Sequence, residues 1–185
     1  MWYNYEHMFL NPEKFVEYCD THLGMKVADL GSSIGQYSIP LAKRVGSAGK
    51  VYAVDIQKDL LLKLKAEATR KKVSNIEIIW GDIETAGGTK LKNESVDRVF
   101  IINTTFQIDD KSSLVYEIKR ILKKKGKVIY VDWQDSFGGL GPHPDNIITS
   151  EMITQLFEKG GFIKECDLPS GDHHYGILFI KQHGE

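Results

Sequence analysis

The sequence predicts an α/β fold whose seven-stranded sheet is mostly parallel and is covered by helices on both faces. Two observations lead to this prediction. Short apolar runs that end in turns alternate with longer stretches of helical periodicity, which is typical of βαβ units. Toward the C-terminal end, two apolar runs joined across "PSG" predict a hairpin, so the sheet should contain one antiparallel strand at its end.

The expected elements follow one another in a regular order. A helix over 11–24 should begin at the capping residue Asn11, have Pro12 in its first turn and end at Gly24. The predicted strands cover residues 25–31, 50–56, 75–82, 95–105 and 127–133 and the hairpin 162–182. The other predicted helices cover residues 36–46, 58–72, 111–126 and 149–161. The basic run "KRILKKKGK" falls at the end of helix 111–126, where cations complement the helix dipole.

Length and composition exclude several classes of protein. The chain has 185 residues, which suits one domain, with a leading segment and helix over 1–24 and a core over 25–185. Its 24 basic and 25 acidic residues give a net charge of -1, which excludes a strongly basic nucleic-acid binder. No apolar run reaches the roughly 20 residues that span a bilayer, so we expect a cytoplasmic protein without a membrane span. The two cysteines form no C-x-x-C pair, and we expect no metal site.

The stretch "VADLGSSIGQYS", residues 27–38, follows the first predicted strand and fits two unrelated patterns. It contains G-x-S-x-G, the turn that exposes a nucleophilic serine in hydrolases, with Ser33 at the serine position. Asp132, His173 and His174 follow in the chain order of a serine, acid and histidine triad. No earlier strand supplies a loop for the oxyanion hole, which weighs against a small serine hydrolase but leaves it as an alternative.

The same loop is a poor match to the dinucleotide-binding fingerprint. That fingerprint has glycine at its first, third and sixth positions, which here hold Gly31, Ser33 and Gln36. The second glycine of this loop is Gly35, at the fifth position. Asp55 ends the second strand about 20 residues past the loop, where a carboxylate can bind a ribose diol. The sequence therefore favours a cofactor that has a ribose but no pyrophosphate.

With these features in order, the sequence resembles the class I S-adenosylmethionine-dependent methyltransferases along nearly its whole length. The resemblance is carried by "DLGSSIG" after the first strand, "VYAVDIQ" at the second, "WGDIE" after the third and "KRILKKKGKVIYVDW" at the fifth. It implies a single-domain, Rossmann-like, doubly wound sheet with the strand order 3-2-1-4-5-7-6. It also implies S-adenosylmethionine as the cofactor, S-adenosylhomocysteine as the product and methyl transfer to a small molecule by in-line displacement.

The resemblance assigns a role to each motif at the cofactor. Asp29 would serve the methionine amino end, Asp55 the ribose, and Asp82 the adenine amino group. The cofactor-binding residues implied in this way are Asp29, Gly31, Ser32, Ser33, Gly35, Asp55, Ile56, Gly81, Asp82, Ile83 and Asn103. Ser33 departs from the family, which more often has glycine there. At a positive φ angle, a serine costs roughly 1–2 kcal/mol that a glycine avoids.

The acceptor should bind beyond the carboxyl ends of the strands, as ligands do in open α/β sheets. The fourth and fifth strands would deliver Asn103, Thr104, Thr105, Asp132 and Trp133 to this edge, and the hairpin Asp167, Asp172, His173, His174 and Tyr175. The aromatic leading segment would close over the site with Tyr3, Tyr5 and Phe9, or would instead pack against the sheet or form a dimer contact. The catalytic candidates are Asn103, Asp132, His173 and His174. A histidine at this edge is either a general base near neutral pH or only a hydrogen-bonding group.

The class of acceptor and the alternatives follow from what the motifs lack. The end of the fourth strand reads "NTTF" instead of the N-P-P-Y signature of methyltransferases that act on exocyclic or amide nitrogens. A small-molecule acceptor is therefore favoured, and no DNA partner is expected. The alternatives are a non-catalytic S-adenosylmethionine-binding module with a degraded loop and the serine hydrolase. We expect a monomer or a homodimer.

Overall fold

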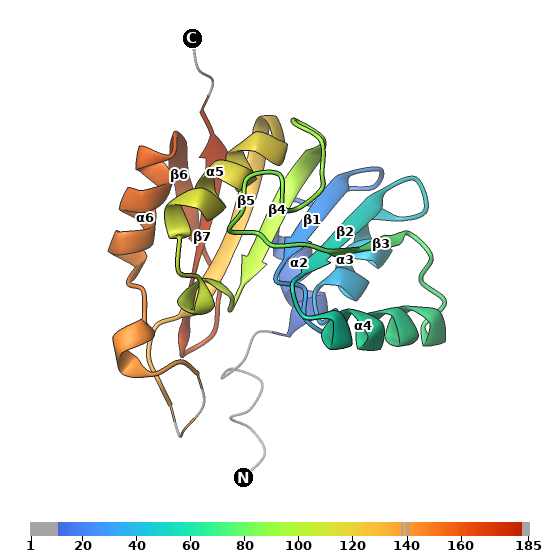
Figure 1. Ribbon diagram of the computed structural model, residues 1–185, viewed down its shortest axis with the longest axis horizontal. Coiled ribbons are helices and arrows are strands. Elements are labelled where there is room, and N and C mark those ends of the chain that lie inside the picture. Colours follow the sequence, from blue (N-terminus) through green and yellow to red (C-terminus); the bar gives the residue numbers. More distant parts are fainter. Residues whose placement is uncertain (1–10, 138, 140, 183–185) are drawn as a thin grey trace.

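The computed structural model describes residues 11–137, 139 and 141–182, and its strands form a seven-stranded sheet in the order β3-β2-β1-β4-β5-β7-β6 (Figure 1). The strands are β1 Lys26–Leu30, β2 Lys50–Asp55, β3 Ile76–Trp80, β4 Val96–Ile102, β5 Leu122–Trp133, β6 Phe162–Leu168 and β7 His174–Lys181. β1 to β5 are parallel, and β7 is antiparallel to both β5 and β6. The predicted strand order and the antiparallel last strand are confirmed.

Helices cover both faces of the sheet (Figure 1). They are α2 Pro12–Tyr18, α3 Ser38–Val45, α4 Lys58–Arg70, α5 Lys111–Ile121 and α6 Ser150–Lys159, with short 3-10 helices η1 Thr105–Gln107 and η2 Pro144–Asn146. One face is covered by α2, α3 and α4, and the other by α5 and α6. Because the central strands are covered on both sides, β1 and β4 are buried along nearly their whole length.

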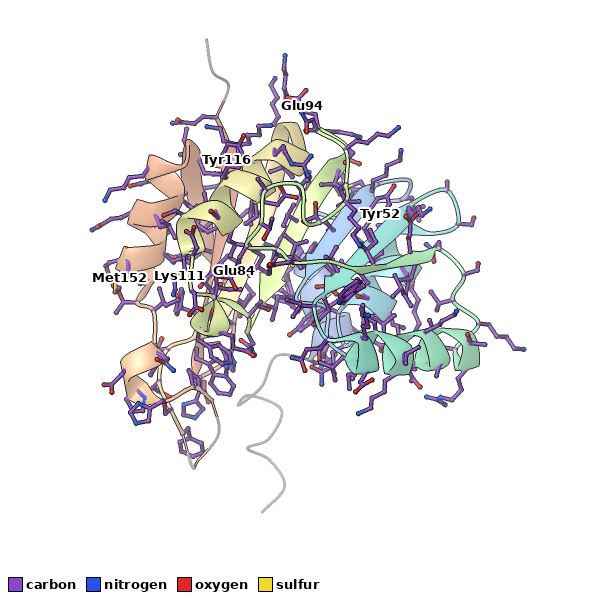
Figure 2. All side chains as sticks on the ribbon, viewed as in Figure 1. Tyr52, Glu84, Glu94, Lys111, Tyr116 and Met152 are labelled. Carbon is purple, nitrogen blue, oxygen red and sulfur yellow. The ribbon has the colours of Figure 1, made fainter. Side chains whose placement is uncertain are left out.

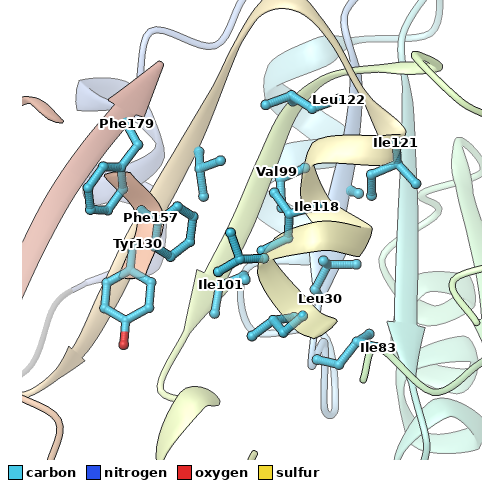
Figure 3. Close-up of a cluster of buried hydrophobic side chains, with 14 of the residues drawn as sticks. Leu30, Ile83, Val99, Ile101, Ile118, Ile121, Leu122, Tyr130, Phe157 and Phe179 are labelled. Atoms are coloured by element: carbon cyan, nitrogen blue, oxygen red, sulfur yellow. The ribbon is translucent and has the colours of Figure 1, made fainter. Parts of the chain in front are cut away.

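The larger part of the core lies between the sheet and helices α5 and α6 (Figure 3). Ile118 of α5 is fully buried in the same cluster as Val99 of β4. Phe157 of α6 stacks on Phe179 of β7 with ring centroids 4.4 Å apart, and it meets Tyr130 of β5 edge-on at 5.9 Å. These contacts fix β4, β5 and β7 relative to one another, and so they fix the edge where β4 and β5 end.

The leading helix is shorter than the sequence predicts. It ends at Tyr18 instead of Gly24, and Leu23, expected on its apolar face, is 79% exposed. The chain leaves the helix at Asp20, which has a φ of 42°. Arg98 donates from Nε to the Asp20 carbonyl and from Nη2 to its carboxylate, at 3.1 and 2.9 Å. These contacts with β4 hold Asp20 outside the helix, and local periodicity does not reveal them.

The basic run after α5 does not lie where the sequence placed most of it. α5 passes directly into β5, so residues 123–127 belong to a strand and the prediction of a helix end there was wrong. Lys123 forms an ion pair with Asp97 at 2.7 Å, and Lys127 forms one with Glu165 at 2.9 Å. The second half of the run is therefore part of the sheet, and Lys123 and Lys127 pair with carboxylates of β4 and β6.

The outer faces of α5 and α6 are solvated. Tyr116 of α5 and Met152 of α6 are exposed and lie on the outside of the molecule (Figure 2). Within the described residues, none of the helices combines the length and the apolar character that crossing a membrane requires.

Candidate functional site

The turn after β1 is built around three residues with left-handed backbone. Gly31, Ser33 and Gly35 have φ angles of 77°, 50° and 88°. A Cβ atom on Gly31 would collide with the Thr104 side chain, and one on Gly35 would lie 2.7 Å from Leu64 Cγ. Both glycines are therefore required by the backbone and by their neighbours. Ser33 adopts the same region with a side chain, so the strain that the sequence made conditional on a positive φ applies to it.

Asp55, at the end of β2, holds this turn in place. Its Oδ2 accepts the N–H of Ser33 and its Oδ1 accepts the N–H of Gln57, both at 2.8 Å. The side chain is buried, and each carboxylate oxygen keeps a second lone pair for a ligand hydroxyl. Asp55 thus joins the ends of two neighbouring strands, and the clamp on Ser33 is a role that the sequence did not reveal.

Asp29 is a buried carboxylate at the end of β1. It accepts a hydrogen bond from the hydroxyl of Ser38, in the first turn of α3. Burial raises the pKa of Asp29 to about 6, the Asp55 carboxylate acts in the same direction, and the Ser38 hydroxyl acts against both. Among the described residues no lysine, arginine or histidine forms an ion pair with it. A cationic group of a ligand would therefore offset its desolvation.

The loop after β3 adds two more carboxylates to the edge. Asp82 accepts the N–H of Glu84 at 2.9 Å and the hydroxyl of Thr85 at 3.0 Å. Glu84 Oε2 accepts both N–H groups of Asp109–Asp110 at 3.0 and 2.9 Å, just before α5 begins at Lys111 (Figure 2). The loop after β3 is thereby fastened to the segment that follows β4.

These turns enclose a cavity of about 350 Å³ at the carboxyl ends of β1 to β4, here called the cofactor cavity. The volume is within the range of small-molecule sites. The described residues that line it are Asp29, Gly31, Ser32, Ser33, Gln36, Tyr37, Asp55, Ile56, Gln57, Leu60, Gly81, Asp82, Ile83, Glu84, Ile102, Asn103, Thr104, Gln107 and Ile108. Several are carboxylates, and none of these lining residues is a lysine or arginine. All the residues predicted to bind the cofactor are among them except Gly35, which packs against Leu64.

The cavity also holds polar atoms that have no partner in the described part of the chain. Ser32 Oγ is buried without a hydrogen bond there, although buried hydroxyls in proteins are nearly always bonded. A Cβ atom on Gly81 would collide with the Gly88 carbonyl, so glycine is required there by the close packing of the loop after β3 on itself. The unsatisfied hydroxyl and the negative charge of the cavity together fit a polar, cationic ligand and disfavour a pyrophosphate.

Several lining residues were not predicted as cofactor contacts. They are Gln36, Tyr37, Gln57, Leu60, Glu84, Ile102, Thr104, Gln107 and Ile108. Gln36, Tyr37 and Gln57 directly follow the predicted motifs, so extending each motif into the next helix would have found them. Gln107 belongs to η1, a short helix that the sequence pattern does not indicate.

Of the catalytic candidates, Asn103 and His174 come together. Asn103 Nδ2 lies 3.1 Å from His174 Nε2, which joins the ends of β4 and β7. His174 lines a second cavity of about 220 Å³, and Asn103 lines both cavities. Burial lowers the pKa of His174, and the charge of His173 acts in the same direction. Because an amide nitrogen only donates, His174 Nε2 accepts, and its imidazole is neutral.

The structure does not bring Asp132 to either cavity. The side chain is buried, and its carboxylate accepts the N–H of Thr105 at 3.1 Å, the N–H of Trp133 at 2.9 Å and the hydroxyl of Tyr130 at 3.2 Å. Burial raises the pKa of Asp132 to about 6. Contrary to the expectation from its place at the end of β5, Asp132 supports the backbone that follows β4.

His173 also lies apart from both cavities and has another partner than expected. Its Nδ1 is 2.7 Å from Asp135 Oδ1, and its ring stacks on Phe137 with centroids 4.2 Å apart. The Asp132 carboxylate is hydrogen-bonded to the segment after β4 and not to a histidine. The triad that the hydrolase alternative requires around Ser33 is therefore not assembled.

The rest of the hairpin contributes little to the edge. Tyr175 turns inward and donates to the Ile148 carbonyl at 2.7 Å. Asp167 forms an ion pair with Lys164 at 2.7 Å, and Asp172 is exposed. The residues expected to close over the site lie outside the described part of the chain, namely Tyr3, Tyr5 and Phe9.

Comparison with known proteins finds a matching family model and relatives that are named methyltransferases. A family model described as "Methyltransferase domain" matches residues 21–172. Human arsenite methyltransferase is 31% identical over 164 residues, which are 69% of this chain and 44% of that protein. Aklanonic acid methyltransferase DauC from Streptomyces sp. (strain C5) is 32% identical over 149 residues, 79% of this chain and 66% of that one. Across the curated relatives compared, the chain spans from 33% to 66% of their length.

Solved structures share the fold. A SAM-dependent methyltransferase from Aquifex aeolicus superposes with a TM-score of 0.86 at 24% identity, covering 95% of this chain and 92% of that one. An arsenic(III) S-adenosylmethionine methyltransferase from Chlamydomonas reinhardtii gives a TM-score of 0.69 at 22% identity, covering 88% and 65%. The fold, the site at the carboxyl edge and the family match agree. The chain belongs to the methyltransferase domain family and has the Rossmann-like fold of the class I S-adenosylmethionine-dependent methyltransferases.

Proposed function

We propose that this chain transfers a methyl group from S-adenosylmethionine to a small-molecule acceptor by in-line displacement. The observation that carries the proposal is the charge of the cofactor cavity, where carboxylates meet and none of the described lining residues is a lysine or arginine. A sulfonium cofactor is cationic, whereas a dinucleotide brings two phosphates, so the cavity favours the former on electrostatic grounds. Membership of the methyltransferase domain family supports the same choice.

In this proposal, different residues of the cavity bind different parts of the cofactor. Asp29 binds the ammonium group, because a buried carboxylate needs a cation, and Asp55 binds the ribose hydroxyls with its remaining lone pairs. Asp82 accepts from the adenine amino group, while Ile56 and Ile83 flank the ring. The Gly31 to Gly35 turn packs its backbone against the methionine portion.

When bound, S-adenosylmethionine supplies a methyl group whose bond to sulfur breaks, with its electron pair going to sulfur, as an acceptor lone pair forms the new bond. A proton that the acceptor loses passes to water. The chain's own task is to hold the acceptor close to the methyl carbon, in line and away from water. Asn103, which lines both cavities, is placed between the two molecules in this proposal.

Arsenite, which appears in the names of two relatives, is not the acceptor that we propose. Trivalent arsenic is a soft centre, and soft centres prefer thiolate ligands. The chain has two cysteines, of which Cys19 is buried beneath α2 and Cys166 is exposed on β6. Burial raises the pKa of the Cys19 thiol. Since neither cysteine lines a cavity, the described residues provide no thiolate there that would hold arsenite.

We also infer a single domain over 1–185, a cytoplasmic location and a monomer or homodimer. Both cysteines are free, which supports a reducing compartment.

Calorimetry with S-adenosylhomocysteine tests the proposed function. The product should bind the purified chain, and a nicotinamide dinucleotide at the same concentration should not, because its phosphates meet the carboxylates. A folded protein that gives no heat with millimolar S-adenosylhomocysteine would contradict the proposal. Methyl transfer from labelled S-adenosylmethionine to a panel of small hydroxyl and amine compounds then separates an enzyme from a non-catalytic binding module.

A further inference from the structure

The second cavity lies directly beside the cofactor cavity and shares part of its wall. The described residues that line it are Pro12, Gln36, Tyr37, Ile102, Asn103, Val131 and His174. Gln36, Tyr37, Ile102 and Asn103 also line the cofactor cavity. A molecule in the second cavity would therefore contact the same side chains as a molecule in the first.

The chemistry of the second cavity differs from that of the first. None of its described lining residues is an aspartate, glutamate, lysine or arginine, and its histidine is neutral because burial lowers the pKa of His174. Pro12, Ile102 and Val131 give one part of it an apolar wall, and uncharged polar side chains such as Gln36 and Asn103 line the rest. An apolar cavity of about 150 Å³ can hold a benzene ring, so a cavity of about 220 Å³ takes one ring with a small substituent. The cavity suits a small and uncharged molecule.

Asn103 is held in an unusual conformation at the junction of the two cavities. Its φ is 53°, in the left-handed region, and its backbone N–H donates to the Val131 carbonyl at 2.9 Å. Its Nδ2 is used by His174, while its Oδ1 is buried and has no hydrogen-bond partner in the described part of the chain. A strained residue with an unsatisfied buried acceptor points to a ligand that donates a hydrogen bond.

His174 determines which end of the Asn103 amide is available. The side chain is 6% exposed, and its ring lies 4.3 Å from that of Trp133. The Asn103 amide directs Nδ2 at His174 Nε2, which accepts in the neutral ring that carries its proton on Nδ1, and this arrangement leaves Oδ1 for a ligand. His174 is therefore a positioning residue that acts through Asn103.

We propose that the second cavity binds the methyl acceptor, and that it selects an uncharged, ring-sized molecule whose hydroxyl or N–H donates to Asn103 Oδ1. This proposal rests on the proposed function and names its class of substrate. The apolar walls hold the ring, and the amide oxygen orients the donor group toward the neighbouring cofactor cavity.

The test uses phenol and toluene, which have nearly the same shape but differ in one hydrogen-bond donor. Each is titrated by NMR into the full chain with saturating S-adenosylhomocysteine. Phenol should bind about tenfold more tightly than toluene, because only phenol satisfies the buried oxygen. Benzoate should bind more weakly than phenol, since its charge would be desolvated. Equal or tighter binding of toluene, or tighter binding of benzoate, would overturn the proposal.

Three variants connect the preference to the named residues. Asn103→Gly removes the amide while tolerating the left-handed backbone, and it should abolish the preference for phenol over toluene. His174→Gln keeps an acceptor for Asn103 Nδ2 and should retain the preference, whereas His174→Leu should lose it. A purely structural role of His174 would instead leave the phenol-to-toluene ratio of His174→Leu unchanged, and that result would contradict the positioning role.

The same titrations separate this proposal from the proposed function. Binding of S-adenosylhomocysteine without a phenol preference overturns the acceptor site and leaves methyl transfer standing. A phenol preference in protein that does not bind S-adenosylhomocysteine supports the second cavity as a donor-selective site and removes the proposed function.

Discussion

The two neighbouring cavities differ in charge and in how the chain builds them. The cofactor cavity is lined by carboxylates such as Asp29 and Asp55, which lie at the carboxyl ends of β1 and β2. The second cavity has no charged residue among its described lining residues, which come from positions as distant as Pro12 and His174. The difference indicates that charge selects the ligand in the first cavity, whereas shape and hydrogen bonding to the Asn103 amide select it in the second.

The largest expected effect comes from Asp55→Ala. The change removes the ribose acceptor and also the carboxylate that accepts the Ser33 N–H at 2.8 Å. Hydrogen bonds to a charged group contribute about 1.5–3 kcal/mol, so the dissociation constant for S-adenosylhomocysteine should rise about 10- to 150-fold in calorimetry. Phenol binding in the second cavity should stay the same, because Asp55 does not line it.

A matched control for this change is available on α4. Asp59 is exposed in the first turn of that helix and lines neither cavity, so Asp59→Ala removes an equal charge from nearby surface. The control should bind S-adenosylhomocysteine as the parent does. Circular dichroism should show that Asp55→Ala is still folded. If this variant binds S-adenosylhomocysteine as tightly as Asp59→Ala does, then neither a ribose contact nor the hydrogen bond from Ser33 to Asp55 contributes to binding.

The pH dependence of binding should also distinguish the two cavities. Burial and the Asp55 carboxylate raise the pKa of Asp29 to about 6 in the free protein, and pairing with the ammonium group of the ligand requires the ionised form. S-Adenosylhomocysteine should therefore bind about tenfold more weakly at pH 5 than at pH 7, with proton release on binding between these values. Phenol carries no charge in this range, and its binding should vary less.

The ionisation of Asp29 affects stability in the opposite direction from ligand binding. The folded-state pKa of Asp29 is raised from 3.8, so protonation favours the folded state, and this group's contribution decreases as pH rises from about 4 to about 6. Asp29→Asn removes both effects: its free energy of unfolding should lose this slope, and its ligand affinity should no longer rise toward pH 7. A variant that keeps the full pH dependence of binding would assign it to another group.

The contrast between the cavities also explains what could be predicted from the sequence. Strand order and most residues that line the cofactor cavity were predictable, because Asp29, Gly31 and Asp55 are in short motifs at strand ends that recur in the family. The carboxyl edge of a parallel sheet then brings such motifs together without further information.

The second cavity was predictable only in part. Asn103 and His174 were candidates because their strands end at the right edge, but their contact depends on how β5 separates β4 from β7. Asp132 was expected at this edge, but its side chain is on the face of β5 that packs against α5 and α6, as alternation along the strand requires. There its carboxylate accepts the N–H of Thr105, a contact that depends on the path of the chain after β4. Long-range packing is not encoded in any local motif.

The smallest expected effect is that of Ser33→Gly. Ser33 has a φ of 50°, and relieving this strain is worth about 1–2 kcal/mol, of which about 0.4–1 is offset by the greater freedom of glycine in the unfolded chain. Urea denaturation should show a free energy of unfolding that is higher by up to about 1 kcal/mol. The N–H that Asp55 accepts remains, so binding of S-adenosylhomocysteine should be preserved or tighter.

Lys72→Gly provides the comparison that gives the Ser33 result its meaning. Lys72 has a φ of 56°, is exposed after α4 and lines neither cavity, so glycine should stabilise the chain there by a similar amount without changing ligand affinity. If both variants gain stability but only Ser33→Gly loses affinity, the serine hydroxyl itself contacts the cofactor. In that case the departure from glycine is a substitution that adds a hydrogen bond to the cofactor turn, and the strain at Ser33 is retained for binding.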